Sequence, residues 1–289
     1  MSTPYHELAR RMAELIREAG RYPLGEFDPV APVSPPASGA PTVLVCSPHP
    51  DDECIVGALA VRLQRETGAR VVNVAVTLGS NRERQPGRLK ELEGACRFLG
   101  FELVTTGPRG LEKVNPKSRA EDPEGWRQKV AVLRDILVER QPDILFFPHD
   151  RDWNGTHIGV HHLVMDALKA AGEGVRCLTV ETEFWGAMDD PNLMVEVPPE
   201  LLGDLMAATS FHVGEVRRNP YHVLLPAWMQ DNVRRGGELV GGQGGAPPEF
   251  AYATLYRFGR WTGAGWEKVE PPNRMLAAGI SVACLLEES

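Results

Sequence analysis

The sequence predicts an α/β fold of the Rossmann-like kind, in which a doubly wound, mainly parallel sheet carries helices on both faces. Between residues 42 and 184, short β-branched and apolar runs alternate with segments whose apolar residues recur at helical spacing. This alternation is typical of parallel sheets, because each crossover between parallel strands needs a helix. The run 143–148 is apolar after its first residue, as expected of a strand buried on both faces.

The expected elements of this region follow one another closely. The first strand, 42–47, leads into a helix over 55–67. The other strands of this region are expected at 70–77, 101–106, 143–148 and 176–184. The other helices are expected at 88–100, 126–140, 158–171 and 198–211. The helix over 88–100 is the best delimited, because it ends on a glycine where a helix C-cap favours that residue.

The N-terminal part differs from this pattern. Apolar residues at helical spacing predict an amphipathic helix over 5–19, whose apolar stripe docks on the main body or on a neighbouring subunit. A stretch rich in Pro, Ser and Ala, 23–41, is expected to be an extended connector. We therefore divide the chain into an N-terminal helix and connector, 1–41, and a single domain, 42–289.

The pattern weakens in the C-terminal third, 185–289, which we expect to shape the choice of ligand. Strand-like aromatic residues occur over 250–266. The glycine-rich stretch 236–245 is expected to be a flexible loop, with a mobile lid as the alternative. His212 and His222 also lie in this third, and a surface position is expected for both.

Composition narrows the class of protein. The chain has 289 residues and a formal net charge of −8, with acidic and basic residues interspersed and no basic block that would indicate nucleic acid as a partner. No apolar run is long enough to span a bilayer, and charged residues interrupt the N-terminus where a secretory signal would be apolar. Five scattered cysteines without a C-x-x-C pair indicate neither a disulfide framework nor a zinc ribbon. We expect a cytoplasmic protein, and homo-oligomer formation is left open.

The loop over 46–54, CSPHPDDEC, packs one imidazole and three carboxylates into five residues. One interpretation is a helix N-terminus, where the macrodipole and free N–H groups favour acidic residues. The other is a metal site, because crowded carboxylates repel one another unless a cation shares them. His49 and Asp52 lie three apart across a turn stiffened by two prolines, so both can reach one ion, and Asp51 is left to hold a water molecule. We favour the metal site.

A second histidine-rich loop, 149–157, follows another expected strand and offers further ligands. A catalytic zinc ion keeps three protein ligands and one position for water. Candidates for the third ligand are His149, His157, His161 and His162. His157 and His161 are four residues apart and share a helix face, as helix-borne zinc pairs do. The H-E-x-x-H pattern of metalloproteases is absent, and the residues alone leave the third ligand open.

The first loop resembles the signature of the PIG-L/LmbE-like zinc de-N-acetylases in the residues PHPDDE at 48–53. Weaker similarities to this family occur at 77–100, 142–147 and 157–168. Carried over residue by residue, the resemblance implies the following roles: metal ligands His49, Asp52 and His157, and general base Asp51. It also implies one zinc ion per chain, with Fe²⁺ or Co²⁺ as alternatives because affinity alone does not select zinc.

One position departs from the family pattern. The family commonly has a histidine three positions before the third ligand, thought to assist catalysis, and this chain has Asn154 there. Either Asn154 plays an uncharged polar role, or His149 or His161 has taken over the catalytic one. The departure is also compatible with a changed substrate or weak deacetylase activity.

The resemblance implies that metal-activated water removes an acetyl group from an N-acetylglucosamine-type substrate, a small-molecule sugar or glycoconjugate. Hydrolysis of a larger amide conjugate in the same site is one alternative. A metal- or sugar-binding protein that has lost catalysis is the other, although a pure binder has no need of the base Asp51.

Three side chains are candidates for substrate binding. Arg88 lies in the family-like helix, Trp153 can stack on a sugar ring, and His149 directly follows a strand. Ordinary packing is the alternative for Trp153, and a structural hydrogen bond is the alternative for His149. Arg82 and Arg84 are expected to lie on a solvated face or in ion pairs.

Overall fold

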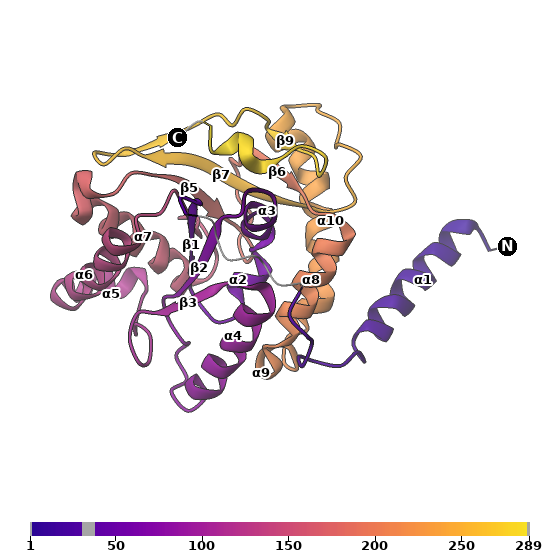
Figure 1. The fold of residues 1–289 in the computed structure, drawn as a ribbon. Coiled ribbons are helices and arrows are strands. Elements are labelled where there is room, and N and C mark those ends of the chain that lie inside the picture. Colours follow the sequence, from indigo (N-terminus) through magenta and orange to yellow (C-terminus); the bar gives the residue numbers. More distant parts are fainter. Residues whose placement is uncertain (1, 31–37, 288–289) are drawn as a thin grey trace.

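The computed structural model describes residues 2–30 and 38–287 and confirms the predicted α/β fold (Figure 1). Its centre is one mixed sheet in the order β3-β2-β1-β4-β5-β7-β6-β9, with β8 paired to β7. The strands are β1 (Thr42–Ser47), β2 (Arg70–Ala75), β3 (Glu102–Thr105), β4 (Ile144–Pro148), β5 (Cys177–Thr182), β6 (Leu193–Glu196), β7 (Ala253–Trp261), β8 (Trp266–Lys268) and β9 (Met275–Leu276). Strands β1 to β5 pair in parallel, whereas β7 is antiparallel to β5, β6 and β8.

Helices cover both faces of this sheet (Figure 1). The helices of the described residues are α1 (Pro4–Ala19), which does not lie on the sheet, and α2 (Asp52–Ile55), α3 (Ala58–Thr67), α4 (Gln85–Leu99), α5 (Pro116–Glu121), α6 (Pro123–Arg140), α7 (Gly155–Ala171), α8 (Pro199–Ser210), α9 (Val213–Val216) and α10 (Tyr221–Gly241). One core contains Leu59 of α3, Leu92 of α4 and Leu205 of α8. A second core contains Leu133 of α6 and Leu163 of α7. The sheet thus separates two hydrophobic cores, as a doubly wound fold requires.

The strand order reverses between β1 and β4. Val43 of β1 pairs with Val71 of β2 on one side and with Ile144 of β4 on the other. All five residues of β4 are buried, which confirms the prediction from its apolar sequence. The carboxyl ends of β1 and β4 therefore lie side by side, at the switch point where open α/β sheets bind ligands. The two histidine-rich loops begin at this point.

The structure corrects one prediction in the patterned region and adds one helix to it. The helix predicted over 55–67 is two helices, α2 and α3, because the chain turns between them at Gly57. A Cβ atom at Gly57 would overlap the carbonyl oxygen of Glu53, so this turn needs glycine. The loop before α6 contains α5, which Asn115 caps by accepting a hydrogen bond from Ser118 N–H.

The C-terminal third holds the largest difference from the predictions. Helix α10 continues through Gly236 to Gly241, so the predicted flexible loop over 236–245 is helical over 236–241, and only 242–245 lie outside the helix. A Cβ atom at Gly236 would collide with the side chains of Met194 and Leu255. The glycine therefore allows α10 to approach the sheet closely, and this packing outweighs the low helix propensity of glycine.

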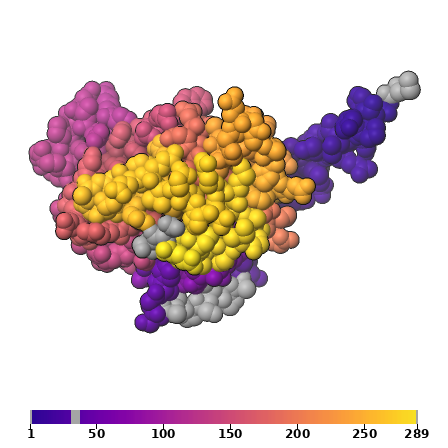
Figure 2. Space-filling view, turned by 90° about the horizontal axis from the view of Figure 1, so that it is seen from above, coloured from indigo at the N-terminus to yellow at the C-terminus, as the bar shows by residue number. Residues whose placement is uncertain are grey.

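Helix α1 confirms the helix predicted over 5–19, but the other residues that the structure describes do not cover its apolar stripe. The helix extends away from the sheet (Figures 1 and 2). The exposed apolar side chains of α1 are Tyr5, Leu8, Met12, Leu15 and Ile16. Docking of the stripe on a neighbouring subunit stays a prediction. Part of the predicted connector, 31–37, lies outside the described residues, and within those residues no helix combines the length and apolarity that crossing a bilayer requires.

Gly159, near the start of α7, sets how closely this helix approaches the segment before α5. A Cβ atom there would lie 2.5 Å from Val114 O and 2.6 Å from Asn115 N. We expect Gly159→Ala to lower the free energy of unfolding by about 1–3 kcal/mol, because overpacking against backbone forces the backbone to shift. The control Gly203→Ala in α8, where the new methyl group meets no atom within 4 Å, should raise it by about 0.4–1 kcal/mol. Urea denaturation measures both, and equal stabilities would contradict this packing.

Candidate metal centre and active-site cleft

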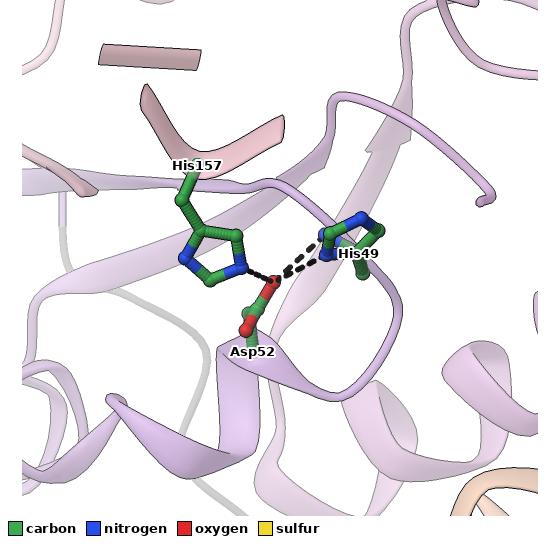
Figure 3. A group of neighbouring side chains, drawn as sticks. All are labelled: His49, Asp52 and His157. Carbon is green, nitrogen blue, oxygen red and sulfur yellow. Dashed lines mark hydrogen bonds and ion pairs between the residues drawn. The ribbon is translucent and has the colours of Figure 1, made fainter. Parts of the chain in front are cut away.

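The loops after β1 and β4 bring three potential metal ligands together (Figure 3). His49 and Asp52 come from the first loop, and His157 comes from the first turn of α7. Asp52 Oδ2 lies 3.5 Å from His49 Nδ1 and 3.3 Å from His157 Nε2. One ligand atom from each residue lies within 4.8 Å of the other two. We call these three residues the metal trio.

The surroundings of the metal trio fit a cation. His157 Nε2 is buried and has no hydrogen-bond partner among the described residues, which is costly unless something else binds it. Burial alone would raise the pKa of Asp52, but the His157 and His49 rings hold that pKa below its usual range, so Asp52 is a carboxylate. Two imidazoles and one carboxylate are a set of ligands that catalytic zinc uses, with a fourth position left for water.

Asp152 lies behind His157, and the sequence analysis did not identify it. Its Oδ2 lies 3.4 Å from His157 Nδ1, and its Oδ1 accepts a hydrogen bond from Asn154 N–H at 2.8 Å. Burial alone would lower the pKa of His157, but the Asp52 and Asp152 carboxylates raise it to about 10. A carboxylate behind a metal-binding histidine orients the ring and raises its basicity. That rule, applied to the acidic residues of the second loop, would have found Asp152.

Asp51 lies beside the metal trio in a backbone conformation that residues other than glycine rarely adopt, with φ at 119°. Its N–H donates a hydrogen bond to Glu53 Oε2 at 2.9 Å, and its carboxylate lies 3.8 Å from the Arg88 guanidinium. Burial and the neighbouring Asp52 carboxylate raise the pKa of Asp51 well above its usual range. Strained backbone and a raised carboxyl pKa are both typical of functional positions, and a general base needs a pKa near the working pH.

A buried pair, Glu53 and His212, holds this loop from the side of α8. His212 Nε2 donates a hydrogen bond to Glu53 Oε1 at 2.8 Å, and the Cys54 thiol donates to the same oxygen at 3.1 Å. His212 is only 1% exposed, and His222 is also buried, so the predicted surface positions of both histidines are wrong. Glu53 therefore links the strained backbone of Asp51 to the C-terminal third of the chain.

We expect His212→Ala to lower the free energy of unfolding by about 3–5 kcal/mol, because removing one partner of a buried pair leaves the other uncompensated. The control Asp204→Ala removes a surface ion pair with Arg65 (2.6 Å) and should cost less than about 1 kcal/mol. Urea denaturation of the metal-free protein measures both variants. A loss for His212→Ala no larger than that for Asp204→Ala would refute the role of this pair.

A cleft of about 340 Å³ opens beside the metal trio, within the size range of ligand pockets. Asp51 lines it, as do Arg88 and Asn154, which the sequence analysis had proposed. Asn154 Oδ1 accepts a hydrogen bond from Thr156 N–H at 2.8 Å and so caps α7. Its Nδ2 makes no hydrogen bond to the described residues, which leaves an amide donor for a ligand.

Three other residues proposed from the sequence do not line this cleft. Trp153 is 84% exposed. His149 Nε2 donates to Gly186 O at 2.9 Å, and His161 Nδ1 donates to Pro148 O at 3.1 Å. The structure does not bring these side chains to the cleft beside the metal trio, and it gives no support to the substrate or catalytic roles proposed for them.

The sequence analysis missed most of the other residues that line the cleft, namely Arg84, Trp185, Glu215, Arg218 and Tyr221. Their side chains come from three separate segments: one directly before α4, one after β5, and the stretch 215–221, which runs from α9 to the start of α10. Only folding brings these segments together, so no local pattern marks them.

Residues 44–168 match the family model of PIG-L, described as GlcNAc-PI de-N-acetylase. The matched stretch contains the whole metal trio and Asp51. The chain contains a PIG-L domain. The resemblance to this family that the sequence predicted is thereby confirmed over residues 44–168. This stretch supplies the metal trio and part of the cleft lining, whereas Trp185, Glu215 and Tyr221 follow it in the chain.

Solved structures share the fold of the PIG-L domain and of the residues that follow it. N,N'-diacetylchitobiose deacetylase from Pyrococcus horikoshii is 19% identical with a TM-score of 0.55, and the match covers 91% of this chain and 94% of that one. A deacetylase in the biosynthesis pathway of teicoplanin is 16% identical with a TM-score of 0.54, covering 76% of this chain and 98% of that one. The 4-carboxy-2-hydroxymuconate hydratase GalB from Pseudomonas putida KT2440 is 16% identical with a TM-score of 0.53, covering 75% of this chain and 95% of that one. No curated protein sequence gives a significant match. One fold thus carries more than one reaction, and the reaction has to be argued from the site.

Proposed function

We propose that this chain is a metal-dependent de-N-acetylase that hydrolyses the acetamide of an N-acetylglucosamine-type substrate. The observation that carries the proposal is the convergence of His49, Asp52 and His157, with a buried His157 Nε2 that makes no hydrogen bond to the described residues, beside the raised-pKa carboxyl of Asp51. All four residues belong to the PIG-L domain. Zinc is the proposed metal, because two imidazoles and one carboxylate suit it, and the location is proposed to be cytoplasmic.

The residues divide the chemistry between them. A metal ion held by the trio would polarise the acetamide carbonyl and lower the pKa of a water molecule. Asp51 accepts a proton from the attacking water, because it is a buried carboxylate beside the trio that is not itself one of the proposed ligands. Asn154 Nδ2 donates a hydrogen bond to the acetamide oxygen as negative charge develops there, a contact that typically contributes about 3 kcal/mol.

The departing amine also needs a proton. The family's histidine is replaced by Asn154, whose amide cannot transfer one. Burial and the Asp51 carboxylate raise the pKa of Tyr221 to about 12, and Glu215 is an ionised partner of arginines. Asp51 therefore returns the proton it took from water, and the products are acetate and a free amine. Base and acid are one residue in this scheme.

The fold also admits a second reaction, addition of water to a carbon–carbon double bond, because a structural neighbour is described as a hydratase. The arginines on the cleft wall favour an acidic substrate such as an unsaturated polycarboxylate. The family match favours amide hydrolysis, and so does Asp51, which serves that reaction both as base and as acid.

The test is release of amine and acetate by protein reconstituted separately with Zn²⁺, Fe²⁺ and Co²⁺. Substrates are N-acetylglucosamine, N,N'-diacetylchitobiose and an N-acylglucosamine with a longer acyl chain, and an unsaturated tricarboxylate tests hydration by loss of its ultraviolet absorbance. We expect equimolar amine and acetate from at least one acetylated sugar. Hydration without amine release would replace the proposal with the second reaction. Bound metal with no turnover of any substrate would favour a metal-binding protein that has lost catalysis.

A further inference from the structure

Three arginines line the cleft beside the metal trio. Arg84 directly precedes α4, Arg88 lies in the first turn of α4, and Arg218 lies between α9 and α10. The proposed hydrolysis of a neutral acetamide needs none of these positive charges at the reacting bond. Their presence in one cleft therefore needs a separate explanation.

The carboxylates of the described residues neutralise the positive charge of these arginines only in part. Glu215 accepts a hydrogen bond from Arg84 Nη2 at 3.0 Å and also pairs with Arg218 Nη2. Burial would raise the pKa of Glu215, but Arg218, Arg88 and Arg84 hold it below its usual range. One ionised carboxylate is thus shared by two guanidinium groups, and the one carboxylate of the described residues within 4 Å of Arg88 is that of Asp51, at 3.8 Å.

The hydrogen-bond donors of the three arginines are also incompletely used. Arg84 donates through Nη2 to Gly214 O and Glu215, Arg88 donates through Nη2 to Pro50 O, and Arg218 donates through Nη2 to Glu215. A guanidinium has five N–H donors. The Nε and Nη1 donors of all three side chains have no acceptor among the described residues.

The charged residues of the cleft also favour binding of an anionic group. Three arginines line the cleft together with three acidic residues, Asp51, Asp52 and Glu215. A divalent ion held by the metal trio would add positive charge to this lining. Guanidinium groups with free donors bind the oxygens of phosphate or carboxylate groups in two-pronged geometry.

We propose that the cleft recognises an acidic group, a phosphate or a carboxylate, attached to the acetamido sugar, with Arg84 and Arg218 as its binding residues. This inference rests on the proposed deacetylation and adds the charge of the substrate. Trp185 and Tyr221, whose rings meet edge to face with centroids 5.2 Å apart, line the same cleft and pack on the sugar ring.

The experiment compares kcat/KM for matched acetamido sugars with the metal-loaded enzyme. N-acetylglucosamine 1-phosphate and 6-phosphate are the phosphate arm, N-acetylmuramic acid is the carboxylate arm, and N-acetylglucosamine and its methyl glycoside are the neutral arm. We expect at least one acidic sugar to exceed the neutral ones by about 10- to 100-fold, the factor that a charged hydrogen bond of roughly 1.5–3 kcal/mol provides. The arm that responds distinguishes phosphate from carboxylate.

Substitution of Arg84 and Arg218 tests whether these two residues cause the preference for acidic sugars. Arg84→Gln and Arg218→Gln should each raise KM for the preferred acidic sugar by about 10-fold or more, a larger change than in its kcat or in the KM of the neutral sugars. The matched control is Arg82→Gln, since Arg82 belongs to the same loop as Arg84 but pairs with Glu112 at 2.8 and 2.5 Å and does not line the cleft. It should change neither class of substrate.

A binding measurement separates this inference from the proposed function. Calorimetry with glucosamine 6-phosphate and with glucosamine needs no turnover, and the phosphate should bind more tightly in wild type but not in Arg84→Gln/Arg218→Gln. Deacetylation at equal kcat/KM for acidic and neutral sugars would overturn the acidic subsite and leave the function standing. Tight phosphate binding without amine release from any sugar would overturn the function and leave the subsite standing.

Discussion

Asp51→Asn is expected to lower kcat by about 10²–10⁴-fold, the usual contribution of a positioned general base or acid. The upper end is expected because Asp51 serves both steps in the proposed reaction. The substitution is close to isosteric, and the hydrogen bond that fixes this residue runs from its backbone N–H to Glu53, so the loop should keep its conformation. The metal trio should therefore keep its ion. Steady-state kinetics on a confirmed substrate and metal analysis of the same sample measure the two effects.

The control for this variant is Asp189→Asn, which changes an acidic residue that pairs with Arg151 on the surface (3.0 Å). It should leave kcat and metal content unchanged. Full activity of Asp51→Asn on that substrate would remove Asp51 from the mechanism. Loss of the metal together with activity would instead make Asp51 a ligand rather than the base.

The sequence predicted the fold best where local pattern and tertiary packing agree. The apolar run of β4 is buried on both faces in the structure, so its burial could be predicted from its own residues. Helix α10 shows the opposite case, because Gly236 lowers helix propensity and yet is needed where α10 meets Met194 and Leu255. Met194 and Leu255 are distant from Gly236 in the sequence, so the residues around position 236 do not reveal this contact.

The residues of the cleft also divide into those that a local sequence pattern reveals and those that only the fold brings together. His49, Asp51 and Asp52 are adjacent in one loop, so a short motif was enough to propose them. Arg218 and Trp185 reach the cleft from the C-terminal third, where the sequence pattern is weak and the family match has ended. The residues proposed for catalysis could therefore be named from local sequence, whereas the cleft residues from the C-terminal third depend on long-range folding.

His157→Ala is expected to abolish stoichiometric metal binding and reduce turnover to background. It removes one of three proposed ligands and leaves two, fewer than catalytic zinc sites use. Asp152→Asn should have a graded effect, since the carboxylate lies 3.4 Å from His157 Nδ1 and orients the ring without touching the ion. Loss of such a partner typically weakens metal affinity about 10- to 100-fold. Metal content after dialysis and competition with a chelator measure the series.

His162→Ala is the control, because His162 lies on the same helix, contacts His161 and does not line the cleft. It should bind metal as wild type does. Removing His157 also leaves Asp52 and Asp152 without their cationic partner, so urea denaturation of each metal-free variant must show that it folds before its metal content is compared. A folded His157→Ala variant with wild-type metal affinity would place the ion elsewhere. In that case Asp152→Asn should also bind metal normally. Normal affinity in both variants would show that the ion binds elsewhere, whereas weaker binding by Asp152→Asn alone would show that the metal trio still holds the ion without His157.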